Sequence, residues 1–521
     1  MKTIDQIQQP VNRPERILQY GEGNFLRGFA DWQVDILNEK TNFNGNVVAV
    51  QPRNRKGAQG ALINAQRGLY TTVLRGLKGE KRTEEIRVVR SLSRCVNPYT
   101  QFDEYIACAE NPELRFVFSN TTEAGISYGE GEELHDRPQL SFPGKVAAFL
   151  HRRYEYFRGD PSKALVFIPC ELIERNGDTL RRVVERHAAA WKLGEDFARW
   201  LGACVFCNTL VDRIISGFPG NEAETLWEKL GYRDDLLTAG ELFYLWVIEK
   251  PKTAPGVPAW DYRRELPLEE AGLNIVWTDT LDFYRTRKVR ILNGAHSSTA
   301  LAAYLYGLDT VDQCVTDPLV YRFMRQAIFD EIIPSIDLEN GPGKGTGVEA
   351  LVRFAHETLE RFANPFITHQ LLSIGLNSVS KFKTRILPSI FSYQKKYGRP
   401  PRALCCSLAA LIVFYRGRIV TDGEMEGCRI KNQEEFRYPI RDNGEILRYF
   451  ADIWTAPDGS RNLVHRALSC PELWGEDLSL YPALEDAVSA ALETMLTEGT
   501  GAALSRALGG PGAEPGDNRD R

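Results

Sequence analysis

A strand, a glycine-rich turn, a helix and a second strand follow one another near the N-terminus, and this order constrains the fold more than any other feature. Residues 16–20 form a short run typical of a buried strand, and the glycine-rich turn at residues 21–28 follows at once. Residues 29–38 carry apolar side chains at helical spacing, and residues 46–50 form a second strand-like run. The arrangement predicts a dinucleotide-binding α/β unit.

The glycines of the turn have distinct expected uses. Gly21 permits a tight turn, and Gly23 lets the backbone approach a pyrophosphate group that rests on the helix N-terminus. The pattern departs from the usual fingerprint, because Leu26 stands where a third glycine is expected and Gly28 comes two positions later. Taken alone, the motif is equally consistent with an ordinary glycine turn between a strand and a helix.

The residues after the second strand leave the choice of nucleotide open. The acidic residue that would bind a ribose hydroxyl is replaced by Gln51, which is followed by Pro52 and Arg53. Gln51 could still bond a ribose hydroxyl. Arg53, Arg55 and Lys56 could instead bind a 2′-phosphate, so residue chemistry alone does not separate NAD from NADP.

Further strand-like runs alternate with helical patterns in this half of the chain. They lie at residues 68–74, 86–92, 115–119 and 164–168. Such alternation predicts a mostly parallel sheet covered by helices.

Polar residues follow two of these strands directly. Asn120 and Thr121 come after one strand, and Cys170 and Glu171 come after the next. Because ligands bind outside the carboxyl ends of strands in open α/β sheets, Asn120 and Thr121 are candidate cofactor contacts. The alternative, ordinary polar loop residues, is equally probable from the sequence.

Composition excludes several classes of function. The chain has 521 residues, a formal charge of −5 and 26% charged residues, with no dense basic run, so no nucleic-acid surface is expected. No apolar stretch is long enough to span a bilayer, and the first ten residues lack a secretory apolar region. The ten scattered cysteines fit reduced thiols, so we expect a cytoplasmic protein without a membrane or metal partner.

The second half of the chain has a different pattern of apolar residues. From about Leu281 onward strand-like runs almost disappear, and helical periodicity dominates. We therefore expect an α/β protein with a Rossmann-like domain at residues 1–280, followed by a mainly α-helical domain at residues 281–508. The Gly/Pro/Asp-rich residues 509–521 are predicted to be a disordered tail.

Three polar residues at the start of an apolar helical run are the candidate catalytic group: Lys288, Asn293 and His296. At about 100° per residue on an α-helix, Asn293 lies roughly 140° and His296 roughly 80° round from Lys288. The ammonium, the amide and the imidazole would then share one broad face and could bind and deprotonate a hydroxyl. The alternative is an exposed lysine beside a core-facing histidine.

Two charged segments are candidate substrate contacts. Asp212 and Arg213 lie side by side in an apolar run, as either a local ion pair or a substrate contact. Lys381 and Arg385 add positive charge to a stretch that also carries His369. That stretch is either a solvated basic face or a seat for an anionic substrate, because lysine and arginine bind carboxylates directly.

Taken together, these segments resemble the polyol-specific long-chain dehydrogenases, the family of mannitol dehydrogenase and the hexuronate reductases. The resemblance rests on the glycine pattern Gly21-x-Gly23-x-Phe25, on residues 208–214 and on the spacing of Lys288, Asn293 and His296. Residues 116–127, 168–173 and 369–374 resemble the hexuronate-reducing branch. The resemblance covers the chain from about Pro14 to the final helices.

The resemblance implies NAD as the cofactor, no metal, and an active site between the two domains. It implies reversible oxidation of D-altronate to D-tagaturonate, a hexuronate and aldonate pair, and leaves a monomer or a dimer open. Lys288 would be the acid/base, Asn293 and His296 would contact the reacting carbonyl, and Asp212 and Lys381 would contact substrate. The nucleotide would be held by Ile17, Leu18, Gln19, Tyr20, Gly21, Glu22, Gly23, Asn24, Phe25, Leu26, Arg27 and Gly28.

Two positions depart from the mannitol-oxidising members of the family. Leu172 stands in place of an asparagine that polarises the carbonyl, and Arg285 stands in place of a glutamate three residues before the lysine. Both changes disfavour a neutral polyol, and Arg285 would suit a uronate carboxylate. A fructuronate-reducing enzyme, a lyase with Lys288 as a Schiff-base nucleophile and a nucleotide-binding regulatory module remain alternatives.

Overall fold

The chain divides into two compact units, Met1–Leu281 and Asp282–Arg521. The computed structural model describes residues 1–54, 59–79, 81–121, 125–250, 261–338, 347–431, 434–455 and 459–509. The predictions for Arg55, Lys56 and residues 510–521 of the tail fall outside the described residues. Among the residues that are described, no helix has the length and apolar character needed to cross a bilayer.

The N-terminal unit is built on a six-stranded parallel sheet in the order β5-β2-β1-β6-β7-β8. Counted along the chain, these strands have the spatial order 3-2-1-4-5-6 of the Rossmann fold. The predicted α/β class with a mostly parallel sheet is confirmed. The strands are β1 (Glu15–Tyr20), β2 (Asn46–Val50), β5 (Leu92–Val96), β6 (Phe116–Ser119), β7 (Val166–Pro169) and β8 (Val205–Phe206).

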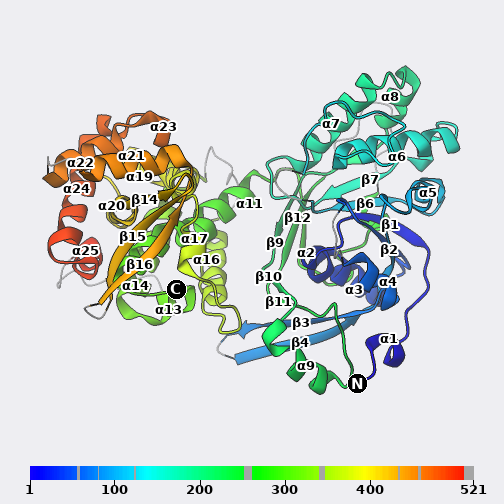
Figure 1. Ribbon diagram of the computed structural model, residues 1–521, viewed down its shortest axis with the longest axis horizontal. Coiled ribbons are helices and arrows are strands. Elements are labelled where there is room, and N and C mark those ends of the chain that lie inside the picture. The colour runs from blue at the N-terminus through cyan, green and yellow to red at the C-terminus, as the bar shows by residue number, and fades with distance from the viewer. Residues whose placement is uncertain are drawn as a thin grey trace. The chain divides into compact units, whose positions relative to one another are not determined.

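Helices connect and cover these strands (Figure 1). The helix after the glycine turn is composite, because its second segment, η1, is π-helical. The helical elements of this unit are α1 (Ile4–Ile7), α2 (Asn24–Leu26), η1 (Arg27–Asp31), α3 (Trp32–Lys40), α4 (Gly60–Ala65), α5 (Phe102–Ala107), η2 (Cys108–Glu110), α6 (Phe142–Tyr156), η3 (Pro161–Lys163), α7 (Asn176–Ala190), α8 (Glu195–Leu201), η4 (Gly220–Glu222), α9 (Ala223–Leu230) and α10 (Tyr262–Glu265).

Both faces of the parallel sheet are buried, and its side chains alternate between them. Ile17 and Phe116 pack on one face with Phe29 of η1. Leu18 and Val117 pack on the other face with residues of α5, α6, α7 and α8. Burial on both sides explains why these strands are continuous apolar runs in the sequence.

Two smaller sheets complete the N-terminal unit and correct the single-sheet expectation. One has the order β10-β11-β3-β4 and the other β13-β12-β9. The predicted strand at 68–74 is part of β3, which forms an antiparallel hairpin with β4, and the run at 86–92 ends β4 and begins β5. Their bounds are β3 (Tyr70–Lys78), β4 (Lys81–Val89), β9 (Thr209–Asp212), β10 (Ile215–Gly217), β11 (Thr238–Glu241), β12 (Leu245–Glu249) and β13 (Ile275–Thr278).

The C-terminal unit is predominantly helical, in agreement with the predicted class. Its helices are α11 (Asp282–Arg287), η5 (Lys288–Asn293), α12 (Gly294–Tyr306), α13 (Val311–Thr316), α14 (Pro318–Arg325), η6 (Gln326–Ile332), α15 (Ile333–Ser335), α16 (Val348–Phe362), α17 (Leu371–Ile374), α18 (Ser378–Arg385), α19 (Leu387–Tyr397), α20 (Arg402–Phe414), α21 (Gly444–Thr455), α22 (Gly459–Leu468), α23 (Pro471–Trp474), η7 (Leu478–Leu480), α24 (Pro482–Thr497) and α25 (Thr500–Ala507).

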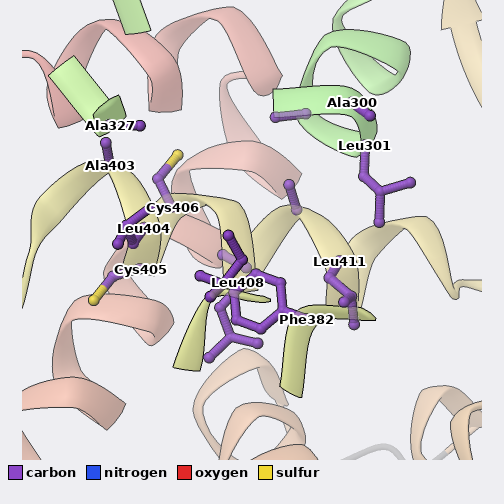
Figure 2. Packing of buried hydrophobic residues seen from close by; sticks show 14 of the residues in the cluster. Ala300, Leu301, Ala327, Phe382, Ala403, Leu404, Cys405, Cys406, Leu408 and Leu411 are labelled. Atoms are coloured by element: carbon purple, nitrogen blue, oxygen red, sulfur yellow. The ribbon is translucent and has the colours of Figure 1, made fainter. Parts of the chain in front are cut away.

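Helix α20 lies at the centre of this unit's core. Nearly all of its side chains are buried, including Leu404, Leu408 and Leu411. Figure 2 shows them with Leu301 of α12 and Phe382 of α18, which belong to the same apolar cluster. The core therefore fixes α12 and α18, two of the helices that carry candidate site residues.

The C-terminal unit also contains an antiparallel sheet that the sequence pattern did not predict. It consists of β14 (Gly417–Thr421), β15 (Glu424–Lys431) and β16 (Glu434–Arg441). Only a few side chains, such as Met425, Tyr438 and Ile440, face the core, and charged residues fill most of the other positions. The apolar alternation is therefore too sparse to indicate strands from the sequence.

Candidate active site

The glycine turn lies at the topological switch point of the parallel sheet. Strands β1 and β6 are neighbours, and the sheet continues from them in opposite directions, so the crevice that binds ligands in such sheets opens at their carboxyl ends. Gly21 follows β1 with φ of +130°, a conformation that glycine adopts readily. A Cβ at Gly21 would also lie 2.9 Å from Leu26 Cδ1 and 3.4 Å from the carbonyl oxygen of Asn120.

The side of the turn at Gly23 is open. Among the described residues, no atom outside Gly23 and its two chain neighbours lies within 4 Å of the position that a Cβ on Gly23 would occupy, and the helix begins at the next residue, Asn24. An open backbone at a helix N-terminus fits the approach of a pyrophosphate. Gly28 serves close packing instead, because its Cβ would lie 2.7 Å from Ile215 Cδ1. The close helix–strand contact usually made at the third glycine is thus made at Gly28.

The other residues predicted to hold the nucleotide fall into two groups. The side chains of the first group are buried in the protein interior next to the turn: Ile17, Leu18, Gln19, Tyr20, Leu26 and Arg27. Those of the second group are partly or fully exposed: Glu22, Gly23, Asn24 and Phe25. Direct contact with a nucleotide therefore remains a prediction mainly for the second group and for backbone atoms of the first.

Polar groups at the ends of β6 and β7 meet, as the strand-end pattern indicates. Asn120 Nδ2 donates to the carbonyl of Cys170 at 2.7 Å. The backbone N–H of Thr121 donates to Glu171 Oε1 at 3.0 Å, and Ser119 Oγ donates to Glu171 Oε2 at 2.9 Å. Burial raises the pKa of the Glu171 carboxyl, while these hydrogen bonds lower it. Glu171 therefore fixes the edge on which Asn120 and Thr121 lie.

Gln51 lies at the end of β2, where the fingerprint places its acidic residue. Its side chain is buried, and Nε2 donates to the carbonyl of Arg53 at 2.7 Å. The side-chain nitrogen is thus bonded within the loop.

Arg213 has a different environment from the one that a substrate contact suggests. Its guanidinium lies over the rings of Trp32, at 4.3 Å, and Tyr244, at 5.1 Å. It donates to the backbone carbonyl of Gly28 at 2.9 Å, and burial lowers its pKa to about 10. These contacts tie β9 to the helix of the glycine turn. The neighbouring Asp212 is buried, and its substrate contact remains a prediction.

The lysine segment of the C-terminal unit is not an α-helix, which corrects the geometry assumed from the sequence. Lys288 to Asn293 form the π-helix η5, and α12 begins at Gly294. A π-helix joins residue i to residue i+5, so residues five apart lie close to one side. Lys288 and Asn293 therefore lie closer together around the helix than the 140° expected for an α-helix. Both side chains are partly buried.

His296 is held by aromatic rings. Its imidazole stacks on Phe362 of α16 at 4.1 Å between centroids and meets His369 edge-on at 5.2 Å. His369 precedes α17, whereas Phe362 ends α16. Two segments outside α12 thus contact the imidazole of His296.

Positive groups gather beside these histidines. Burial and the charge of Lys381 lower the pKa of His369. Burial and the charge of Arg385 lower the pKa of Lys381, and Asp442 opposes this shift. Lys381 Nζ donates to the carbonyl of Ile374 at 2.9 Å, and a small hollow next to it is lined by Ser297, Ser378 and Lys381 itself. The environment is therefore cationic and partly desolvated.

Arg385 joins this group to α12, because its Nη1 donates to Ser297 Oγ at 3.2 Å. Arg285 lies on α11 and is partly exposed. Leu172, in contrast, is 62% exposed, so it leaves the position of the missing asparagine apolar and accessible.

Several residues of these arrangements could not be singled out from the sequence. Phe362 and Ser297 contact the candidate residues from elsewhere in the helical unit, and no local motif marks them. Asp31 lies three residues after Gly28 and resembles an ordinary helical acid, although it is fully buried below the turn. Only its place inside an apolar helical stretch hinted at burial.

In a comparison with known proteins, each of the two units matches a domain of one protein family. Residues 15–262 match the mannitol dehydrogenase Rossmann domain, and residues 280–496 match the mannitol dehydrogenase C-terminal domain. The chain is 41% identical to altronate oxidoreductase from Yersinia enterocolitica, covering 97% of this chain and 99% of the relative. It is 44% identical to altronate oxidoreductase from Bacillus subtilis, covering 91% and 92%.

Two solved structures share the fold. A Pseudomonas fluorescens mannitol 2-dehydrogenase in ternary complex with NAD and D-mannitol has a TM-score of 0.67 at 22% identity, covering 96% of this chain and 95% of that one. A substrate-free D-sorbitol dehydrogenase has a TM-score of 0.75 at 20% identity, covering 97% and 100%.

The Rossmann sheet, the open glycine turn and the two family matches define an oxidoreductase that uses a nicotinamide cofactor. More particularly, the chain belongs to the mannitol dehydrogenase family.

Proposed function

We propose that this protein interconverts D-altronate and D-tagaturonate with NAD as the hydride carrier. The observation that carries the proposal is the 41–44% identity to altronate oxidoreductases over 91–97% of the chain. The matched length is great enough to extend over both units.

The N-terminal unit is proposed to bind NAD. In support, its glycine turn stands at the switch point, is open at Gly23 and leads directly into a helix. Gln51 in place of the acid still offers a carbonyl oxygen to a ribose hydroxyl, because its nitrogen is the atom bonded to Arg53. The mannitol 2-dehydrogenase of similar fold was solved with NAD, which also favours NAD over NADP.

The C-terminal unit is proposed to move the proton. Bound NAD supplies the hydride acceptor during alcohol oxidation, and its reduced form supplies the hydride in the reverse direction. Lys288 would take the proton of the reacting hydroxyl, or return it to the keto oxygen during reduction. Asn293, one π-helical turn away, would donate a hydrogen bond to the same oxygen as negative charge develops. His296 would contact the neighbouring hydroxyl from its stacked position.

The cationic group is proposed to bind the carboxylate that distinguishes an aldonate from a polyol. The charge of Lys381 lowers the pKa of His369, and the charge of Arg385 lowers the pKa of Lys381, so the three groups lie near one another. A bound carboxylate would relieve that repulsion through charge-assisted hydrogen bonds. Arg285, which stands three residues before Lys288, is a further candidate for this contact.

A substrate comparison tests the proposal. NADH and NADPH oxidation would be measured with D-tagaturonate, D-fructuronate and D-fructose at equal concentrations. We expect NADH with D-tagaturonate to give the highest kcat/KM, and D-fructose to react poorly because it lacks the carboxylate. A higher kcat/KM for D-fructuronate or for D-fructose would contradict the assigned substrate.

A further inference from the structure

Both carbonyl groups at the start of the glycine turn point into the protein. The side-chain amide of Gln19 donates to the carbonyl oxygen of Gly21 at 3.1 Å. The guanidinium of Arg27 donates to the carbonyl oxygen of Glu22 at 2.7 Å. Gln19 is 0% and Arg27 is 1% exposed, so both donors act from below the turn.

The orientation of these carbonyls determines the orientation of two amide groups. In a planar trans peptide the N–H points opposite to the C=O. The N–H of Glu22 shares a peptide plane with the Gly21 carbonyl, and the N–H of Gly23 shares one with the Glu22 carbonyl. Both N–H groups are therefore directed away from the buried donors. Two adjacent outward N–H groups form a concavity suited to an anion.

The buried donors are held in place by their own partners. Gln19 Nε2 also donates to Asp31 Oδ2 at 3.2 Å, and Asp31 is fully buried in η1. Arg27 donates to Asn24 Oδ1 at 2.6 Å and to Thr238 Oγ1 at 3.2 Å. Arg27 and Asp31 are the first and last residues of the π-helical segment η1, and both are buried next to the turn that precedes it.

We propose that Gln19, Asp31 and Arg27 are positioning residues, which hold two turn carbonyls inward and so aim the N–H groups of Glu22 and Gly23 at the pyrophosphate of the nucleotide. The inference rests on the proposed NAD site and gives these residues a role without nucleotide contact. A purely structural network would stabilise the fold but would not discriminate between ligands with and without a pyrophosphate.

The first test compares two buried amides. Gln19→Leu removes the donor to Gly21. Gln33→Leu is the matched control, because Gln33 is also fully buried and its side-chain atoms have no hydrogen-bond partner among the described residues. We expect Gln19→Leu to raise the Kd for NADH and for ADP-ribose by about tenfold or more, the effect of a lost strong hydrogen bond. The Kd for adenosine, the KM for D-tagaturonate and the binding of the Gln33→Leu variant should not change.

The second test uses rescue by conservative variants. Asp31→Asn keeps an oxygen that accepts from Gln19, whereas Asp31→Ala removes it. Arg27→Lys keeps a positively charged donor group on a single nitrogen, whereas Arg27→Met keeps no donor. We expect the conservative member of each pair to bind ADP-ribose more tightly than its partner. These pairs keep the inference testable if Gln19→Leu fails to fold.

Two results have different consequences. If the unaltered protein does not bind NADH, the proposed nucleotide site itself is wrong. If it binds NADH and ADP-ribose but Gln19→Leu binds them equally well, or loses adenosine by the same factor, the positioning role is overturned and the nucleotide site stands.

Discussion

Each unit contains a π-helical turn in its candidate functional segment, and the two turns are used differently. All five residues of η1, Arg27 to Asp31, are buried below the glycine turn. In η5, by contrast, only Ile291 and Leu292 are buried, and the remaining side chains reach partly exposed positions. π-helical turns are rare in proteins, and those that occur often lie at functional sites. Under the proposed function, η1 would support the backbone that binds the nucleotide, and η5 would present catalytic side chains.

The difference follows from what each segment must offer. In the proposed nucleotide site the pyrophosphate is bound by backbone N–H groups, which leaves the buried side chains of η1 for packing and orientation. In the proposed mechanism a side chain transfers the proton, and η5 leaves Lys288 partly exposed while its apolar residues Ile291 and Leu292 are buried.

The largest expected effect concerns η5, the π-helical segment that carries Lys288. Lys288→Ala should lower kcat for D-tagaturonate reduction by about a hundredfold to ten-thousandfold, the usual contribution of general acid–base catalysis. The Kd for NADH, measured by fluorescence titration, should remain unchanged because the glycine turn is intact. A variant that keeps normal kcat would show that η5 does not supply the acid/base.

The next effect separates the cationic group from ordinary surface charge. Lys381→Met should raise the KM for D-tagaturonate by roughly tenfold to a hundredfold, as expected for a lost charge-assisted hydrogen bond. Lys383→Met is the control, because Lys383 is exposed on the same helix. Steady-state kinetics of both variants, with D-fructose as a neutral substrate, would reveal whether the effect depends on the carboxylate. Equal losses for the two variants would favour a solvated basic face.

A pair of glycine substitutions compares the packing of the two turns. Gly28→Ala would place its Cβ 2.7 Å from Ile215 Cδ1, and we expect a loss of about 1–3 kcal/mol from overpacking. The nearest described atom to a Cβ at Gly294, directly after η5, is Ile332 Cδ1 at 3.4 Å, so the helix should tolerate Gly294→Ala or become slightly more stable. Thermal unfolding of both variants would measure this contrast. Equal destabilisation would show that the two turns are packed alike.

The smallest expected effect is a pH dependence of the unfolding free energy that comes from Asp31 of η1. Burial raises the pKa of Asp31 from 3.8 to about 7. A carboxyl whose pKa is raised by folding binds a proton more tightly in the native state, so its contribution is fully present below about pH 4 and is lost as the pH rises through about 7. Asp31→Asn should therefore flatten the decline in unfolding free energy over this interval. An unchanged slope would mean that Asp31 does not titrate there.

The sequence was sufficient for features that depend on local backbone chemistry. The strand runs ending at Tyr20 and Val50, the tight turn at Gly21 and the change to helical texture near Leu281 all leave patterns of period, glycine and polarity. Their structural outcomes agree, because strands buried on both faces and turns with positive φ require particular residues.

Features that depend on tertiary packing could not be predicted from local sequence patterns. The π-helical form of η5 differs from an α-helix by hydrogen-bond register, for which the run after Lys288 has no local signal. The stacking of His296 on Phe362 joins positions far apart in the chain. Likewise, whether β3 joins the parallel sheet or a separate one depends on partners, because apolar alternation identifies a strand and not its neighbours.

One isotope experiment tests the central claim most directly. The unaltered protein and the Lys288→Ala variant would each be given D-tagaturonate and NADH deuterated at the transferable position, and the product would be analysed by mass spectrometry and NMR. We expect D-altronate with deuterium on the former keto carbon from the unaltered protein, and almost none from the variant. Cleavage products, unlabelled D-altronate, or equal labelling by both proteins would contradict it.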